Sequence, residues 1–62
     1  MAKKGSIVLS NSEEITKLRE YLRSNGIKFE TSGYFDSGTY FAIWGMSDEE
    51  YTALEKFVEE EL

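Results

Sequence analysis

The chain lacks the two residue types that most often act as nucleophiles, bases or metal ligands. Its 62 residues contain no cysteine and no histidine. Serine–lysine and paired-carboxylate arrangements are therefore the remaining routes to covalent or acid–base catalysis. The serines stand where helix caps and turns need them, and no spacing selects a serine–lysine pair. We therefore expect no enzymatic activity, no catalytic residue and no cofactor.

Asp48, Glu49 and Glu50 form the one tight acidic group near an expected structural corner. Such carboxylates can bind a hard cation, but no second cluster supplies the further oxygen ligands. Acids are also favoured in the first turn of a helix, where they face the positive end of its dipole. The triplet therefore predicts a helix start and no metal site. Residues 33–39 contain two glycines but no lysine, so they do not predict a phosphate-binding loop.

A group of large aromatic residues is the first of two features that indicate a function. Tyr34, Tyr40 and Trp44 fall on one face of an expected hairpin, and Val8 and Ala42 are expected among them. Rings on a sheet face that no helix covers form an apolar patch of a few hundred Å², and such patches often mark contacts. The alternative is that the rings only stabilise a thin sheet through cross-strand pairing. We favour a contact surface, because so short a chain has few other supports.

Charge is the second such feature, since the net charge of −5 is unevenly distributed. Residues 1–28 hold six basic and three acidic side chains, whereas residues 29–62 hold one basic and nine acidic ones. Seven of those nine acids lie in residues 46–62. Glu59, Glu60 and Glu61 fall at a helix C-terminus, where the dipole disfavours them, which indicates a role outside the fold. A solvated face that keeps the protein soluble is the alternative.

The first half of the chain predicts a strand and a helix. Ser6–Ser10 is a β-branched run with Ile7 and Leu9 on one face and Val8 on the other, after a flexible arm of residues 1–5. A helix is expected from about Ser12 to about Asn25, with Asn11 or Ser12 as its cap and Asn25-Gly26 as its end. Its inward stripe is expected to contain the following residues: Ile15, Leu18, Tyr21 and Leu22.

Residues 27–35 and 39–45 predict a hairpin around Asp36-Ser37-Gly38. The register that suits this turn gives the following pairs: Phe35 with Thr39, Tyr34 with Tyr40, Gly33 with Phe41, Thr31 with Ile43, and Glu30 with Trp44. One face then carries Ile27, Phe29, Thr31, Phe35, Phe41 and Ile43. The other carries Lys28, Glu30, Ser32, Tyr34, Tyr40, Ala42 and Trp44.

The second helix has the clearest local signal in the sequence. Ser47 and Glu50 have capping-box spacing, and Met46 and Tyr51 occupy the positions of a hydrophobic staple. The helix is expected to run to about Glu61. Its inward stripe is expected to contain the following residues: Tyr51, Leu54, Phe57 and Val58.

These elements predict a single α+β domain over residues 1–62, in the order β-α-β-β-α. We expect a three-stranded, mainly antiparallel sheet in the order 1-3-2, with both helices packed on one face. The alternative places strand one in parallel beside strand two, through a right-handed crossover. The preferred arrangement resembles a ferredoxin-like fold without its last strand, an architectural comparison that implies no function.

The sequence thus favours a non-enzymatic protein-binding module. Its aromatic sheet face would contact a partner or a second copy in a homodimer, and the acidic helix would face a basic surface. One concrete version is an acidic inhibitor, of phage or mobile-element type, of a nucleic-acid-handling protein. The expected partner-binding residues are Val8, Tyr34, Tyr40, Trp44, Glu55, Glu59 and Glu60.

Two other functions stay open. Sheet aromatics with Lys3, Lys4 and Lys28 could bind single-stranded nucleic acid, a likeness to the RNA-recognition motif in outline only. A dimer cleft could instead bind a small regulatory ligand. No apolar run approaches the roughly 20 residues that cross a bilayer, and the N-terminus does not read as a signal peptide, so we expect no membrane contact and a cytoplasmic location.

Overall fold

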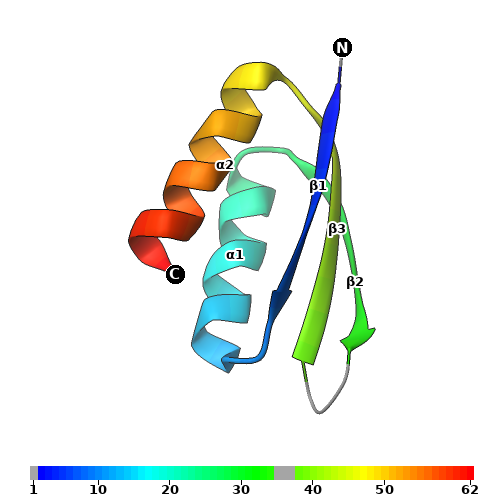
Figure 1. Cartoon of the computed structure of the whole chain (residues 1–62), viewed down its shortest axis with the longest axis vertical. Helices are drawn as coiled ribbons and strands as arrows, with labels where there is room; N and C mark the ends of the chain where they lie inside the picture. The colour runs from blue at the N-terminus through cyan, green and yellow to red at the C-terminus, as the bar shows by residue number, and fades with distance from the viewer. Residues whose placement is uncertain (1, 35–37) are drawn as a thin grey trace.

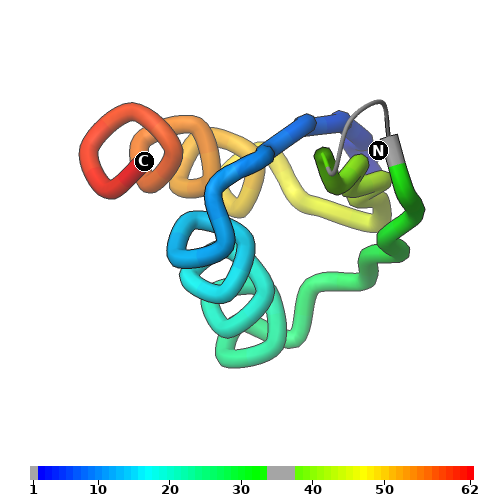
Figure 2. The backbone as a smooth tube through the Cα atoms, turned by 90° about the horizontal axis from the view of Figure 1, so that it is seen from below, coloured from blue at the N-terminus to red at the C-terminus, as the bar shows by residue number. Residues whose placement is uncertain are grey.

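The computed structural model describes residues 2–34 and 38–62, with the backbone alone at Tyr34. The elements are β1 (Lys3–Leu9), α1 (Ser12–Ser24), β2 (Lys28–Tyr34), β3 (Gly38–Met46) and α2 (Asp48–Glu61). The strands form one antiparallel sheet in the order β1-β3-β2. Both helices lie on one side of this sheet and leave the other side open (Figures 1 and 2). The predicted α+β fold and strand order are confirmed, and the parallel alternative is wrong.

Local capping explains where α1 begins and ends. The side chain of Asn11 accepts hydrogen bonds from the backbone N–H groups of Glu13 and Glu14 at 2.9 and 3.2 Å, so Asn11 and not Ser12 is the cap. At the other end, Gly26 adopts φ 65° and donates to the carbonyl of Arg23, while Ile27 donates to Leu22. This is a Schellman motif, and its left-handed residue is the predicted glycine.

The second helix begins as its sequence predicts. The backbone N–H of Ser47 donates to the Glu50 carboxylate at 2.8 Å, and the N–H of Glu50 donates to the Ser47 hydroxyl at 3.1 Å. The capping box is therefore complete. The rings of Tyr21 and Phe57 stack at 4.3 Å between centroids, which joins the two helices to each other.

The first strand starts earlier than predicted. Lys3, Lys4 and Gly5 belong to β1 and not to a flexible arm, so that part of the prediction is wrong. The reason lies in β3, which is nine residues long and continues to Met46. Met46 pairs with Lys3, so the far end of β3 provides backbone partners that a local reading of residues 1–5 does not reveal.

The predicted hairpin register is wrong by two residues. Tyr34 pairs with Gly38, Thr31 with Phe41 and Lys28 with Trp44, and Gly33 lies opposite Thr39 instead of Phe41. In this register Phe29 lies opposite Ile43, whereas the predicted register would have placed it opposite Gly45. The predicted turn residues Asp36 and Ser37, and the predicted pair of Phe35 with Thr39, involve positions outside the described residues. Because the shift is even, the predicted faces of both strands are preserved.

One face of β3 forms the centre of the core. Phe41 and Ile43 are almost completely buried beneath the helices, together with Leu18 and Leu22 of α1 and Leu54 of α2. The strand then breaks its alternation, because Gly45 has φ 73° and the register with β1 shifts between Lys3 and Gly5. This is a β-bulge with one extra residue in β3. The extra residue turns Met46 into the core, where it is fully buried, and leaves Trp44 outside.

The bulge yields a stability prediction. Gly45→Ala should lower the free energy of unfolding by about 1–2 kcal/mol, because an L-residue is strained in the left-handed region. An added Cβ at Gly45 would meet only the Cδ atom of Lys28, at 3.9 Å, so the loss measures backbone strain and not a clash. Urea denaturation measures the change.

Gly33→Ala is the matched control in the same sheet. Gly33 has no positive φ, and a Cβ there meets no atom within 4 Å, so this variant should be neutral or slightly more stable. Equal losses in the two variants would contradict the assignment of the bulge to Gly45.

Candidate binding surfaces

The open face of the sheet carries the first candidate surface. The pairing of β3 with β1 and β2 places the outward residues of the sheet in rows across the strands. Val8, Tyr40 and Ser32 form one row, and Ser6, Ala42 and Glu30 form the next. Trp44 begins the third row, opposite Lys28. We call this set the open face.

The exposure of these side chains follows the alternation of the strands. Val8 is 44% exposed and Trp44 is 38% exposed, whereas Tyr40 and Ala42 are half-buried. Tyr40 and Trp44 border a shallow hollow of about 440 Å³ over Ala42. The side chain of Tyr34 lies outside the described part of the chain, so its predicted place among these rings stays a prediction. The described rings of Tyr40 and Trp44 therefore flank a hollow over Ala42.

The open face also carries basic residues. Lys4 lines the same hollow as Trp44, and Lys28 lies opposite Trp44 on the other side. Both lysines are exposed, and Glu30 is the acidic residue in the neighbouring row. This end of the open face thus combines an exposed indole with two positive charges, although the whole chain has a net charge of −5.

Lys3 lies on the opposite side of the sheet from Lys4. Its ammonium group is 3.7 Å from the carboxylate of Asp48 and 5.1 Å from the centre of the Tyr51 ring. The Lys3 side chain therefore contacts the N-terminus of α2 through an exposed ion pair and a cation–π contact. Grouping Lys3 with Lys4 and Lys28 as one phosphate-binding set was wrong, because neighbouring strand residues point to opposite faces.

The acidic residues of α2 divide into two groups. Near its N-terminus, Asp48 lies beside Lys3 and Glu50 completes the capping box. In the C-terminal half, Glu55, Glu59, Glu60 and Glu61 are all exposed. Across residues 2–34 and 38–62, no salt bridge reaches any of these four carboxylates. The second group therefore contributes charge to the surface without a partner inside the described fold.

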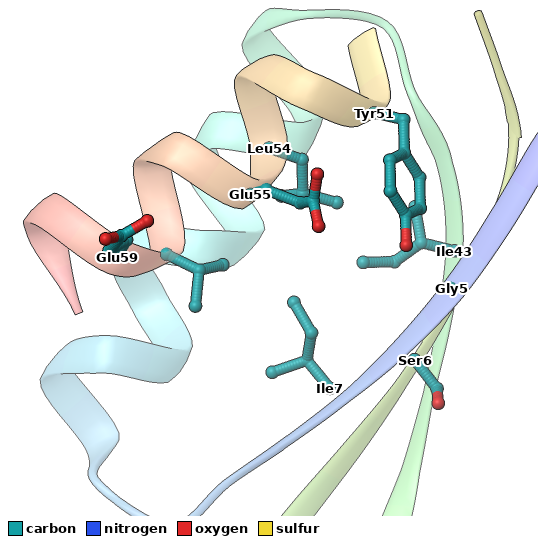
Figure 3. Close-up of a pocket in the computed structure, with 9 residues that line it drawn as sticks. Gly5, Ser6, Ile7, Ile43, Tyr51, Leu54, Glu55 and Glu59 are labelled. Atoms are coloured by element: carbon teal, nitrogen blue, oxygen red, sulfur yellow. The ribbon is translucent and has the colours of Figure 1, made fainter. Parts of the chain in front are cut away.

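A groove between β1 and α2 is the second candidate surface, and sequence reasoning missed it. Its volume is about 350 Å³. Ile7 points from β1 toward the helix, Tyr51 stands over Gly5, and Glu55 and Glu59 extend from α2 along the rim (Figure 3). Other lining residues are Ser6, Ile43, Leu54 and Val58. We call this feature the β1–α2 groove.

The two surfaces bring together different parts of the predicted site. Val8, Tyr40 and Trp44 belong to the open face, and Glu55 and Glu59 belong to the rim of the β1–α2 groove. Since the helices cover only one side of the sheet, the surfaces lie on opposite sides, with β1 between them (Figure 2). Glu60 is exposed on α2 but does not line the groove. One flat partner surface therefore cannot contact all of these residues at once.

The part of the chain that the structure describes contains neither a candidate metal site nor a candidate membrane-spanning helix. No three acidic side chains there are grouped so that they could hold a metal ion. None of the described helices has the length and apolar character needed to cross a membrane.

Compared with known proteins, the chain matches no family model, no curated protein and no solved structure.

The acids of α2 yield a second stability prediction. Glu55→Gln with Glu59→Gln should leave the protein as stable as the wild type, or more stable by about 0.2–0.5 kcal/mol. The pair removes a like-charge i,i+4 repulsion. Glu59 also lies in the last turn of α2, where the dipole disfavours acids. Glu50→Gln is the contrasting variant, since it weakens the capping box and should lower stability. A clear loss of stability in the double variant would show that Glu55 and Glu59 support the fold.

Proposed function

We propose that the chain is a non-enzymatic protein-binding module whose partner has a basic surface. The observation that carries this proposal is the set of exposed carboxylates on the C-terminal half of α2, which have no ion-pair partner among the described residues. Glu55 and Glu59 repel each other at i,i+4, Glu59 to Glu61 oppose the helix dipole, and Lys56 is the single basic residue of α2. Complementary charge on a partner would offset that repulsion and speed the encounter.

The open face supports a second contact within the same function. Trp44 and Val8 are the two large apolar side chains that are exposed in the described structure. Tryptophan is among the residues that contribute most to binding when a partner buries it. The hollow between Tyr40 and Trp44 can receive an apolar side chain of the partner over Ala42.

The partner class follows from the charge. A basic surface that binds an acidic helix is typical of proteins that handle nucleic acid, since such proteins neutralise phosphates with lysine and arginine. An inhibitor of phage or mobile-element type, which occupies such a surface, is the concrete version that we propose.

Affinity capture from lysate tests the proposal. The wild-type chain should retain one or more basic proteins, and Glu55→Gln with Glu59→Gln should weaken that retention and its salt sensitivity. Glu13→Gln with Glu20→Gln is the matched control, because it removes the same charge from exposed positions of α1. Equal retention by both double variants would contradict a role for α2.

Trp44→Ala tests the open face. It should weaken capture by tenfold or more, a typical effect of truncating an aromatic residue at an interface. Its effect on thermal stability should be smaller than that of Phe41→Ala, since Phe41 is fully buried and Trp44 is not. Sedimentation of the purified chain separates a heterologous partner from self-association. A dimer that dissociates in the Trp44→Ala variant, with no other protein captured, would replace this proposal by a homodimer.

The exposed row of Lys4, Trp44 and Lys28 favours one second candidate, the binding of single-stranded nucleic acid. A base can stack on an indole while neighbouring lysines contact phosphates. Titration of labelled oligonucleotides at low salt tests this function. Binding that is lost in Lys4→Gln with Lys28→Gln, and that weakens with added salt, would support it, whereas no binding at low salt would eliminate it.

A further inference from the structure

We propose that the β1–α2 groove binds an extended segment of the partner protein, which adds a fourth strand to the sheet at the free edge of β1. The segment carries lysine or arginine at alternate positions. This inference rests on the proposed function, since it specifies how a basic partner would contact α2.

The backbone of β1 is the first argument. Within the described sheet β1 pairs with β3 alone, so it is an edge strand. Every second residue of such a strand directs its N–H and C=O groups away from the ladder, where they can pair with an added strand. Proteins usually protect such edges with proline, charged residues or bulges. Residues 6–9 contain no proline and no charge, and the bulge lies at the other end, beside Lys3 and Gly5.

The shape of the groove is the second argument. Its floor is apolar, formed by Ile7 from below and by Leu54 and Val58 from α2. Ser6 also lines the groove, although its side chain points to the other side of the sheet (Figure 3), so its contribution is its main chain. The groove therefore presents an edge backbone next to apolar side chains, which is the combination that strand addition uses for affinity and specificity.

The charge of the rim is the third argument. Glu55 and Glu59 are the charged residues among those that line the groove, and both are acidic. They lie one helical turn apart, about 6 Å along the axis. Side chains at positions i and i+2 of a strand are about 6.8 Å apart and point to the same side. Two lysines or arginines at that spacing can lay their methylene stems on the apolar floor and reach one carboxylate each.

A second copy of this chain fits the groove less well. Its own β1 would bring Lys3, Gly5 and Ile7 to the helix side, and Lys3 is already engaged by Asp48. Antiparallel pairing of two β1 edges has its two-fold axis perpendicular to the sheet, so α2 of both copies would lie on the same side and their Glu55 and Glu59 side chains would approach one another. Such like charges are unfavourable without a compensating cation.

A synthetic nine-residue peptide of alternating threonine and lysine is the probe. Titration into the full chain, followed by amide chemical shifts, should perturb Gly5–Leu9 and slow hydrogen exchange in β1. Glu55→Gln with Glu59→Gln should weaken binding on the order of tenfold, the combined effect of two ion pairs. Glu60→Gln with Glu61→Gln is the matched control, since it removes the same charge from α2 outside the groove, and it should change affinity by less than about twofold.

Backbone methylation of the peptide separates strand addition from charge attraction alone. Methyl groups on the amides of the odd positions block one edge of the peptide, and those on the even positions block the other. One methylated peptide should lose binding and the other should keep it, because an added strand uses a single edge for its hydrogen bonds with β1.

Three results would overturn strand addition. They are no binding at millimolar peptide, equal binding by both methylated peptides, and equal losses in the two glutamine double variants. Protection of the β1 amides in the peptide-free chain, together with sedimentation as a dimer, would assign the groove to a second copy. In each case, capture of a basic protein that still depends on Glu55 and Glu59 would leave the proposed function standing, since that capture needs charge but no added strand.

Discussion

The fold depends on the burial of a single face of β3. Phe41, Ile43 and Met46 lie under both helices, and β3 is the strand that pairs with each of the other two. The chain has no cysteine with which to form a disulfide, so apolar burial and local capping supply its stability. Accordingly, α2 begins with a complete capping box and α1 ends in a Schellman motif. Close packing around one strand leaves the opposite face of the sheet without cover.

The bulge at Gly45 links this core to the β1–α2 groove. Ordinary alternation after the buried Ile43 places Trp44 on the open face, and the extra residue at Gly45 then turns Met46 into the core. Met46 also precedes the cap of α2, and its burial fixes where that helix starts over the sheet. Lys3, paired with Met46 in the ladder, contacts Asp48 and Tyr51 of the same helix. The bulge at Gly45 therefore places Met46 in the core, next to the residue that caps α2.

In the acidic half of α2, helix stability and the proposed binding role favour different residues. Helix stability would favour basic residues near a C-terminus, yet Glu59, Glu60 and Glu61 occupy the last turn. The N-terminal acids of the same helix behave differently, since Glu50 caps the helix and Asp48 meets Lys3. In the C-terminal half of α2, Glu55 and Glu59 line the groove and form no salt bridge with the described residues. This acidic surface lowers the stability of the fold and lies beside an apolar floor and a free strand edge. It is suited to a partner that provides positive charge.

The sequence by itself determined which elements form, the cap of α2 and the faces of the strands, because these follow from interactions within a few residues. The spacing of Ser47 and Glu50 is enough to start a helix, and the alternation from Tyr40 to Trp44 is enough to sort inward from outward side chains. Tertiary structure decided the register of the hairpin, since a slip of two residues keeps every face and so leaves the pattern unchanged. It also decided that β1 begins at Lys3, which needs the distant end of β3 as a partner. The groove is visible only in the tertiary structure, because its walls come from β1 and α2, which are far apart in the chain. The burial of Leu54 against the sheet brings these two elements together.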